Sequence, residues 1–249
     1  MKNLKKIYYL LATVLLVSAP VVSADDAESP HVFSGTIGLT TDYLFRGISQ
    51  TDRDPAVQGS FDYTYTPYGF YAGVWASNVD EKFVSDGNIE MDFYGGFRGA
   101  FSNGIGWDVG GIYYHYPAED NATEPDYGEI KGGLSYTFDS VPLSPVASAT
   151  LYYSPDFFGE TGDAYYTDGS IGFTLPYEFG LGFHVGYQDV DDIGDYVDWK
   201  VGISRPMAGF VFNLSYSDVT GDDEDSFCPP PGFDDLCDGT VVFSVSRTF

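Results

Sequence analysis

Charged side chains that could bind ions or transfer protons recur at alternate positions in many stretches of this chain. Alternate residues of an extended segment share one face, so we expect these side chains to line one side of a sheet. Nine are acidic and four are basic: Asp42, Asp62, Glu90, Asp92, Asp108, Glu129, Asp168, Glu178 and Asp198, and Arg46, Arg98, Lys131 and Lys200. A confined surface with this excess of carboxylates would attract cations.

Asp42 and Arg46 are four residues apart on the same face of the first of these stretches. A strand rises about 3.3 Å per residue, so the two side chains would lie roughly 13 Å apart and could not pair directly. We expect each to pair with a charge on a neighbouring strand, and we favour a structural role over ligand binding.

The histidines are His31, His115 and His184, and only His184 shares a face with the charged residues. A Ser-His-Asp or Asp-His catalytic group needs hydrogen-bond contact between its members, and the sequence shows no nucleophile motif. The acidic run 222–225 lacks the spacing of an EF-hand. We therefore expect no enzyme, no metal site and no cofactor, with an enzyme kept as the rival class.

The elements that would position these residues are strands, because apolar and polar residues alternate with a period of two. The last ten residues show this pattern, with Val241, Phe243 and Val245 on one face and Ser244 and Ser246 on the other. Twelve strands are predicted at 32–46, 56–65, 69–78, 88–101, 105–116, 127–138, 145–153, 165–175, 178–189, 197–204, 210–217 and 240–249.

The connections between these strands alternate in length. Tight links at 66–68, 102–104, 176–177 and 206–209, and a slightly longer one at 139–144, follow even-numbered strands; longer, mostly acidic links follow odd-numbered ones. Transmembrane barrels have short periplasmic turns and longer outer loops. The pattern predicts an all-β fold, an up-and-down antiparallel transmembrane β-barrel over residues 32–249.

A soluble all-β protein with the apolar face inward has the same period. Crowding of Gly, Ser and Thr on the polar face favours the membrane barrel instead, because a narrow interior requires small side chains. Aromatic residues also gather near predicted strand ends, as in interfacial girdles. They are Tyr43, Phe45, Tyr113, Tyr153 and Tyr187 at one end and Phe33, Tyr65, Phe101 and Phe249 at the other.

The first 24 residues have the features of a secretory signal peptide. A basic start is followed by an apolar run at 7–17, which is shorter than the about 20 residues of a membrane-spanning helix. Residues 25–31 would form a short segment before the barrel. The net charge of −26 excludes nucleic acid as a partner.

Residues 40–51, Thr-Thr-Asp-Tyr-Leu-Phe-Arg-Gly-Ile-Ser-Gln-Thr, resemble the opening motif of the TorF family of porins, and residues 55–63 and 69–78 extend the match. The distinctive part covers about residues 33–78, and the rest matches in strand pattern and in the terminal Phe249. The resemblance implies a bacterial outer-membrane barrel that is called a porin largely because of its architecture. It implies no particular substrate and no catalytic residues.

We therefore expect a passive outer-membrane pore for small hydrophilic solutes or ions, cation-preferring if open. The charged residues listed above, with His184, would line it. The alternative is a closed structural or surface-binding barrel with acidic outer loops. Expected partners are outer-membrane lipid, lipopolysaccharide and the barrel-assembly machinery, which would recognise the terminal strand and Phe249. Cys228 and Cys237 are expected to form a local disulfide in the last outer loop.

Cleavage after Ala24 should give a mature protein that fractionates with the outer membrane and changes gel mobility on heating. Intact-mass measurement and membrane fractionation test this. Recovery of a detergent-free periplasmic monomer would reverse the assignment of the two sheet faces.

Overall fold

The computed structural model describes residues 29–82, 84, 87–117, 124–191, 193–221, 224–228 and 234–249. The predicted signal peptide, most of the segment 25–31 and the acidic residues 222 and 223 lie outside the described residues. Among those described, no helix is long and apolar enough to cross a membrane.

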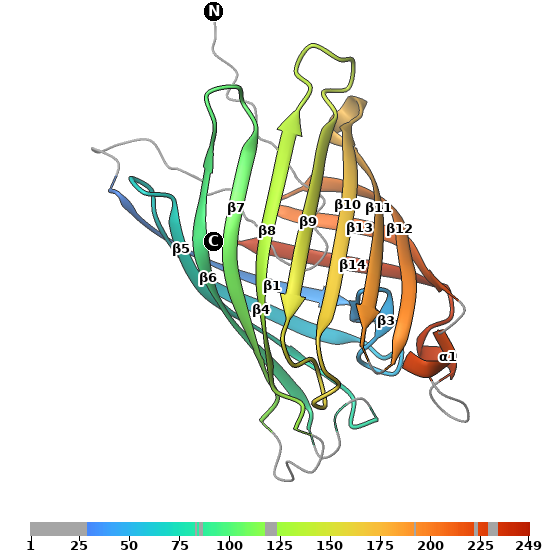
Figure 1. The fold of residues 1–249 in the computed structure, drawn as a ribbon. Helices are drawn as coiled ribbons and strands as arrows, with labels where there is room; N and C mark the ends of the chain where they lie inside the picture. The colour runs from blue at the N-terminus through green and yellow to red at the C-terminus, as the bar shows by residue number, and fades with distance from the viewer. Residues whose placement is uncertain are drawn as a thin grey trace, which may run out of the picture.

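Within the described residues, twelve antiparallel strands close into one barrel (Figure 1). The strands are β1 (His31–Thr40), β4 (Ala56–Tyr65), β5 (Phe70–Asn78), β6 (Ile89–Ala100), β7 (Gly106–His115), β8 (Tyr127–Thr137), β9 (Val146–Ser154), β10 (Ala164–Thr174), β11 (Gly180–Val190), β12 (Gly194–Met207), β13 (Phe210–Thr220) and β14 (Thr240–Thr248). Each pairs with its neighbour along the chain, apart from the pair β1–β14 that closes the ring. The all-β up-and-down barrel predicted from the sequence is confirmed.

The closing seam joins the two ends of the barrel. Thr36 lies opposite Thr248 in the register of β1 and β14, and their hydroxyl oxygens are 3.0 Å apart. The Phe249 amide donates to the Gly35 carbonyl at 2.9 Å, and the Gly35 amide donates to the Phe249 carbonyl at 3.3 Å. The last residue therefore extends the ladder and leaves no open strand edge along this seam.

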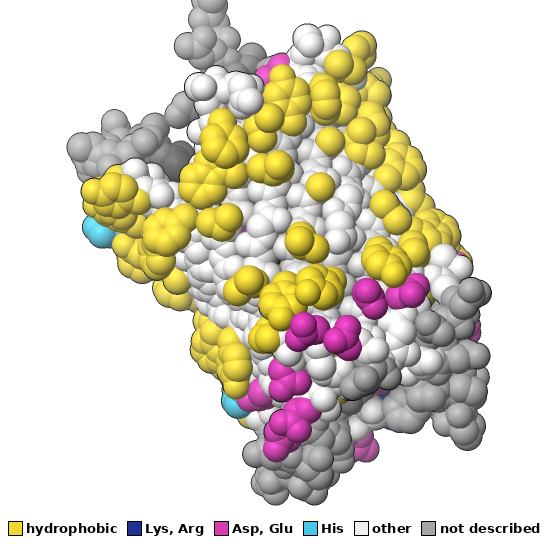
Figure 2. Space-filling view, viewed as in Figure 1, with side chains coloured by type: hydrophobic (Ala, Val, Ile, Leu, Met, Phe, Trp, Pro, Cys, Tyr) yellow, Lys and Arg dark blue, Asp and Glu magenta, His cyan; other side chains and the backbone are white. Residues whose placement is uncertain are grey.

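The wall is apolar outside and polar inside, as alternation in each strand requires. The side chains of Phe33, Ile130 and Val241 are 61%, 64% and 61% exposed, whereas inward Trp75 is 5% exposed. Figure 2 shows apolar side chains spread over the wall and Asp and Glu gathered toward one end. The soluble alternative fails, because a soluble protein does not surround itself with a continuous apolar belt.

Short turns lie at one end of the barrel and most long connections at the other (Figure 1). One predicted long loop is wrong. The link after β11 is only residues 191–193, because β11 and β12 extend beyond their predicted ends. A second correction concerns Glu178, which lies exposed in the turn η1 (Pro176–Glu178) and does not face the interior.

The largest correction concerns the predicted strand 32–46, because β1 ends at Thr40. Residues 42–51 turn into the barrel, where β2 (Leu44–Phe45) and β3 (Ile48–Ser49) pair as a small hairpin. Asp42 and Arg46 thus belong to an inward loop, and the spacing of roughly 13 Å along a strand does not apply to them. Tyr43 is 1% exposed and Phe45 packs in an interior cluster, so neither belongs to an outer girdle.

Outward tyrosines near the long-loop end hydrogen-bond to aspartates. Tyr113 donates to Asp126 at 3.1 Å and Tyr153 donates to Asp163 at 3.2 Å. At the other end, the outward Arg247 Cζ lies 5.0 Å from the ring centroid of Phe249. Such amphipathic side chains suit the boundary between lipid and water.

Deleting Phe249 should impair insertion, because it removes two backbone hydrogen bonds from the seam. Phe249→Tyr keeps those bonds and should insert normally. Tyr68→Ala serves as a control, since it removes an aromatic that is 74% exposed in a turn away from the seam. Heat-dependent gel mobility after refolding into detergent measures insertion. Equal insertion of the deletion variant and both controls would remove the special role of Phe249.

Candidate functional site

The hairpin of β2 and β3 turns through Arg46 and Gly47, whose φ angles are +48° and +86°. Two positive φ angles are typical of a type I′ turn, which suits the twist of a two-residue hairpin. Glycine adopts such angles freely, whereas Arg46 is strained there by an amount on the order of 1 kcal/mol. The turn places the Arg46 side chain at the tip of a loop inside the barrel.

Gly47 brings this tip against the far wall. A Cβ atom at Gly47 would lie 2.7 Å from Val219 Cγ2 and 2.8 Å from Asp198 Cβ, both closer than real contacts allow. Only glycine fits between the hairpin and strands β12 and β13. The Arg-Gly pair therefore fixes both the turn and its depth of insertion.

Hydroxyl groups hold the base of the hairpin. The Asp42 carboxylate accepts hydrogen bonds from Ser49 at 2.7 Å and Thr51 at 3.1 Å. The backbone N–H of Gln50 donates to the Tyr43 carbonyl at 2.7 Å. Burial raises the pKa of the Asp42 carboxyl, and the hydrogen bonds from Ser49 and Thr51 oppose that shift. The loop is thus ordered by its own side chains.

The Arg46 guanidinium is enclosed by the barrel wall. Nη2 donates to both carboxylate oxygens of Glu129, at 2.8 and 2.6 Å, and Nη1 donates to Gln188 Oε1 at 2.6 Å. Its Cζ lies 4.2 Å from the ring centroid of Tyr166 and 4.6 Å from that of Phe45. The Arg46 and Glu129 side chains are 6% and 2% exposed. A buried charge is costly unless paired, and this pair satisfies both partners.

A second group of interior residues surrounds Asp198. Tyr166 donates to Asp198 Oδ2 at 2.9 Å, and His184 Nε2 lies 2.9 Å from Asp198 Oδ1. Lys200 is opposite His184 in the register of β11 and β12. A Cβ atom at Gly186 would overlap Tyr166 and Asp198, so this glycine makes room for the group.

A third group lies on β4 to β8, nearer the short turns. Tyr94 donates to Asp62 at 2.5 Å, and Tyr71 donates to Asp108 at 2.9 Å. Lys131 pairs with Asp108 at 2.9 Å. The opposite wall carries small half-buried side chains: Ser148, Ser170, Ser204, Ser244 and Ser246.

Two inward carboxylates stand apart from these pairs. Glu90 accepts from the Tyr43 hydroxyl at 2.8 Å. Its Oε2 atom and Asp92 Oδ1 are buried without a hydrogen-bond partner among the described residues. The long-loop half of the interior therefore holds two carboxyl groups that no described cation pairs.

The long-loop half is also filled. Val84, Tyr116 and Tyr127 form a buried cluster against which Phe45 packs. Ile48 packs against a second cluster that contains Cys228 and Leu236. The hairpin therefore joins two apolar clusters across the barrel.

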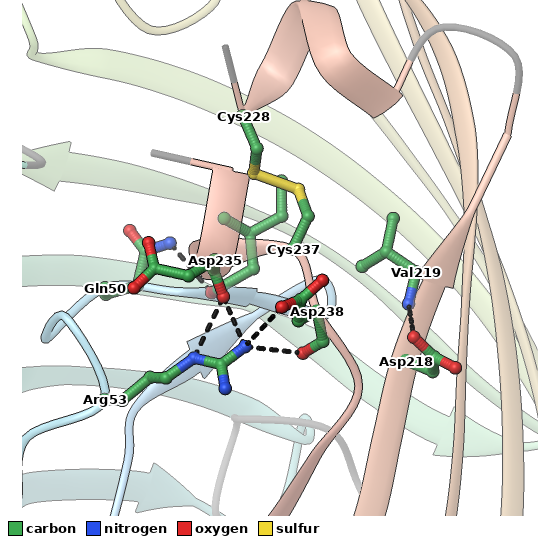
Figure 3. Close-up of a disulfide and its surroundings, with 9 residues drawn as sticks. Gln50, Arg53, Asp218, Val219, Cys228, Asp235, Cys237 and Asp238 are labelled. Atoms are coloured by element: carbon green, nitrogen blue, oxygen red, sulfur yellow. Dashed lines mark hydrogen bonds and ion pairs between the residues drawn. A yellow bond between two sulfur atoms is a disulfide. The ribbon is translucent and has the colours of Figure 1, made fainter. Parts of the chain in front are cut away.

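The connection between β13 and β14 contacts the residues that follow the hairpin, as Figure 3 shows. A disulfide joins Cys228 and Cys237, close to the short helices α1 (Glu224–Phe227) and η2 (Asp234–Leu236). The Arg53 side chain donates to the Asp235 carbonyl and, at 3.1 Å, to the Asp238 carbonyl. The stapled connection and the residues after the hairpin are thus fastened together.

Most of the predicted interior residues fall into these three groups and the Glu90 and Asp92 pair. Asp42 lies at the base of the hairpin, Asp168 is buried on β10, and Arg98 donates to Thr64 at 3.2 Å. Sequence reasoning missed Tyr43, Tyr166 and Gln188 as partners of the charges. The Arg-Gly pair flanked by apolar residues was the available signal for the hairpin. Among the residues that the structure describes, no group of three or more potential ligands is placed to hold a metal ion.

These features define a class: a porin-like outer-membrane β-barrel with a loop folded into its polar interior. The KdgM porin in complex with disordered oligogalacturonate has this fold, with a TM-score of 0.56 at 9% identity, over 87% of this chain and 98% of that one. The NanC porin matches with a TM-score of 0.55 at 8% identity, over 87% and 99%. Identities this low establish the fold alone.

The chain belongs to the family described as "Bacterial protein of unknown function (Gcw_chp)", whose model matches residues 24–249. A search of curated proteins found no match. The family description carries no activity, and the resemblance to the TorF family stays a prediction.

Replacing Arg46 with Ala should release the hairpin. The change leaves Glu129 buried without its cation, a loss of about 3–5 kcal/mol for a buried pair. Hydrogen exchange of residues 44–49 should quicken, while β8 and β11 stay protected. Arg98→Ala, which removes an inward arginine bonded to Thr64, is the control. Unchanged exchange in the hairpin of Arg46→Ala would show that other contacts hold it.

Proposed function

We propose that this protein is an outer-membrane channel for passive diffusion of small hydrophilic cations, closed at rest by residues 42–51. The observation that carries this proposal is the charge of the interior. Without Glu178, inward carboxylates still outnumber the inward basic residues Arg46, Arg98, Lys131 and Lys200. A narrow path through low dielectric focuses such a field and raises the local concentration of cations.

The fold shared with the KdgM and NanC porins supports a channel. The KdgM porin was solved with oligogalacturonate, whose repeating carboxylates make it a polyanion. We do not transfer that ligand, because an interior rich in Asp and Glu would repel it. The proposed solutes have the opposite charge.

The outer membrane is the proposed location, with lipid, lipopolysaccharide and the barrel-assembly machinery as proposed partners. The exposed apolar wall and the terminal strand support these assignments. Acidic side chains beyond the apolar wall (Figure 2) would meet anionic headgroups only through bridging divalent cations.

The alternative function is a closed structural or surface-binding barrel, and the filled long-loop half favours it. An enzyme is the weaker rival. His184 contacts Asp198 and Tyr166 inside the barrel, and neither of these partners is a Ser or Thr hydroxyl that could act as a nucleophile. A channel accounts better for an interior that is filled at one end and lined with serines at the other.

Reversal potentials in planar bilayers under a KCl gradient test the proposal. The parent protein and Arg46→Ala should both prefer potassium. Glu90→Gln with Asp92→Asn should at least halve the permeability ratio of cation to anion, because carboxylates inside the barrel are screened less than exposed ones. The matched control, Asp189→Asn with Asp191→Asn, removes two exposed charges and should change the ratio less.

Two outcomes would contradict the proposal. Anion preference in the parent protein would mean that interior carboxylates do not set selectivity. Absence of conductance in both the parent and Arg46→Ala, with correct insertion, would favour the closed barrel.

A further inference from the structure

We propose that the site around Arg46 is a recognition site for small solutes that carry a guanidinium group, and that Arg46 is its built-in occupant. We call this site the guanidinium cage and define it by Glu129, Tyr152, Tyr166 and Gln188. A solute of this class would compete with Arg46 for the cage and so release the hairpin. The release rests on the proposed channel function, whereas binding to the cage does not.

The cage belongs to the barrel wall and not to the loop. Its residues come from four consecutive strands, β8, β9, β10 and β11, which pair continuously. Movement of the hairpin would remove Arg46 and Phe45 and leave these four side chains on the sheet. The site would therefore persist as a vacant cation site.

Neighbouring groups hold the cage residues in place. The Tyr114 hydroxyl donates to Glu129 Oε2 at 3.1 Å. The Gln188 amide donates to the Tyr165 carbonyl at 3.2 Å, which directs its Oε1 atom toward the guanidinium. A site whose groups are already oriented loses little entropy when a ligand binds.

The geometry selects a planar guanidinium over a compact ammonium ion. Glu129 and Gln188 together accept three N–H bonds from two nitrogens of Arg46, a fork that an ammonium ion does not present. The Tyr166 ring centroid lies 4.2 Å from Cζ and the Tyr152 centroid lies 5.3 Å from it. Aromatic faces stack on guanidinium, and the carboxylate excludes anions.

The resident arginine is held in a strained turn, with φ of +48°, and release of this strain lowers the free-energy cost of exchange. A tethered group competes at an effective concentration on the order of millimolar for a short flexible linker. Free ligand should therefore bind the parent protein weakly and bind much more tightly once the Arg46 side chain is removed.

The test uses methylguanidinium chloride as the probe and methylammonium chloride as its matched control. Calorimetric titration of the detergent-folded full barrel should show that Arg46→Ala binds methylguanidinium at least tenfold more tightly than the parent does. The Arg46→Ala variant should bind methylammonium at least tenfold more weakly than methylguanidinium. Adding Glu129→Gln to Arg46→Ala should remove binding, and Arg98→Ala should behave like the parent.

Arg46→Gln, which keeps a polar side chain, replaces Arg46→Ala if that variant does not show the heat-dependent gel shift of a folded barrel. A folded variant that does not bind methylguanidinium, or that binds both probes equally, would overturn the cage. Binding without conductance would uphold the cage and reject the channel. The parent protein, if it conducts, should have a higher open probability with methylguanidinium than with methylammonium. Equal open probabilities would contradict the proposed release of the hairpin.

Discussion

The pairing of every backbone N–H and C=O group in lipid is the constraint on which this structure depends. Strands in hydrocarbon satisfy it only when the sheet closes on itself. Here closure falls on a single seam between β1 and β14, where Gly35 and Phe249 exchange backbone hydrogen bonds. Closure also fixes the faces, because a ring of alternating strands must put one set of side chains into lipid and the other into a confined space.

That confined space explains the arrangement of the charges. Burying an ion without a partner is costly, so most interior carboxylates face a cation or a tyrosine hydroxyl. Arg46 shows this most fully, since one guanidinium joins the loop to Glu129 on β8 and Gln188 on β11. The same contact that neutralises a buried carboxylate also holds the inward loop. The neutralisation of interior charge and the position of the loop therefore depend on the same contact.

Small side chains matter as much as charged ones. Gly47 and Gly186 are two positions where a single added carbon would collide with Asp198 or its neighbours. The serine-lined wall near the short turns keeps its side chains partly exposed. The interior side chains are thus more fully buried where the hairpin lies than along the serine-lined wall.

The sequence by itself determined the barrel. Period-two alternation and alternating loop lengths gave the strand number, the apolar outer face and most strand ends, because these depend on local geometry that every strand repeats. The charged residues that it placed on the inner face lie inside the barrel, except Glu178, which lies exposed in a turn. The tertiary structure alone decided that residues 42–51 leave the wall: an Arg-Gly turn and an extended strand are both compatible with the local pattern. Only contacts with Glu129, Gln188, Asp198 and Val219, which are far away in sequence, make the inward hairpin the lower-energy choice.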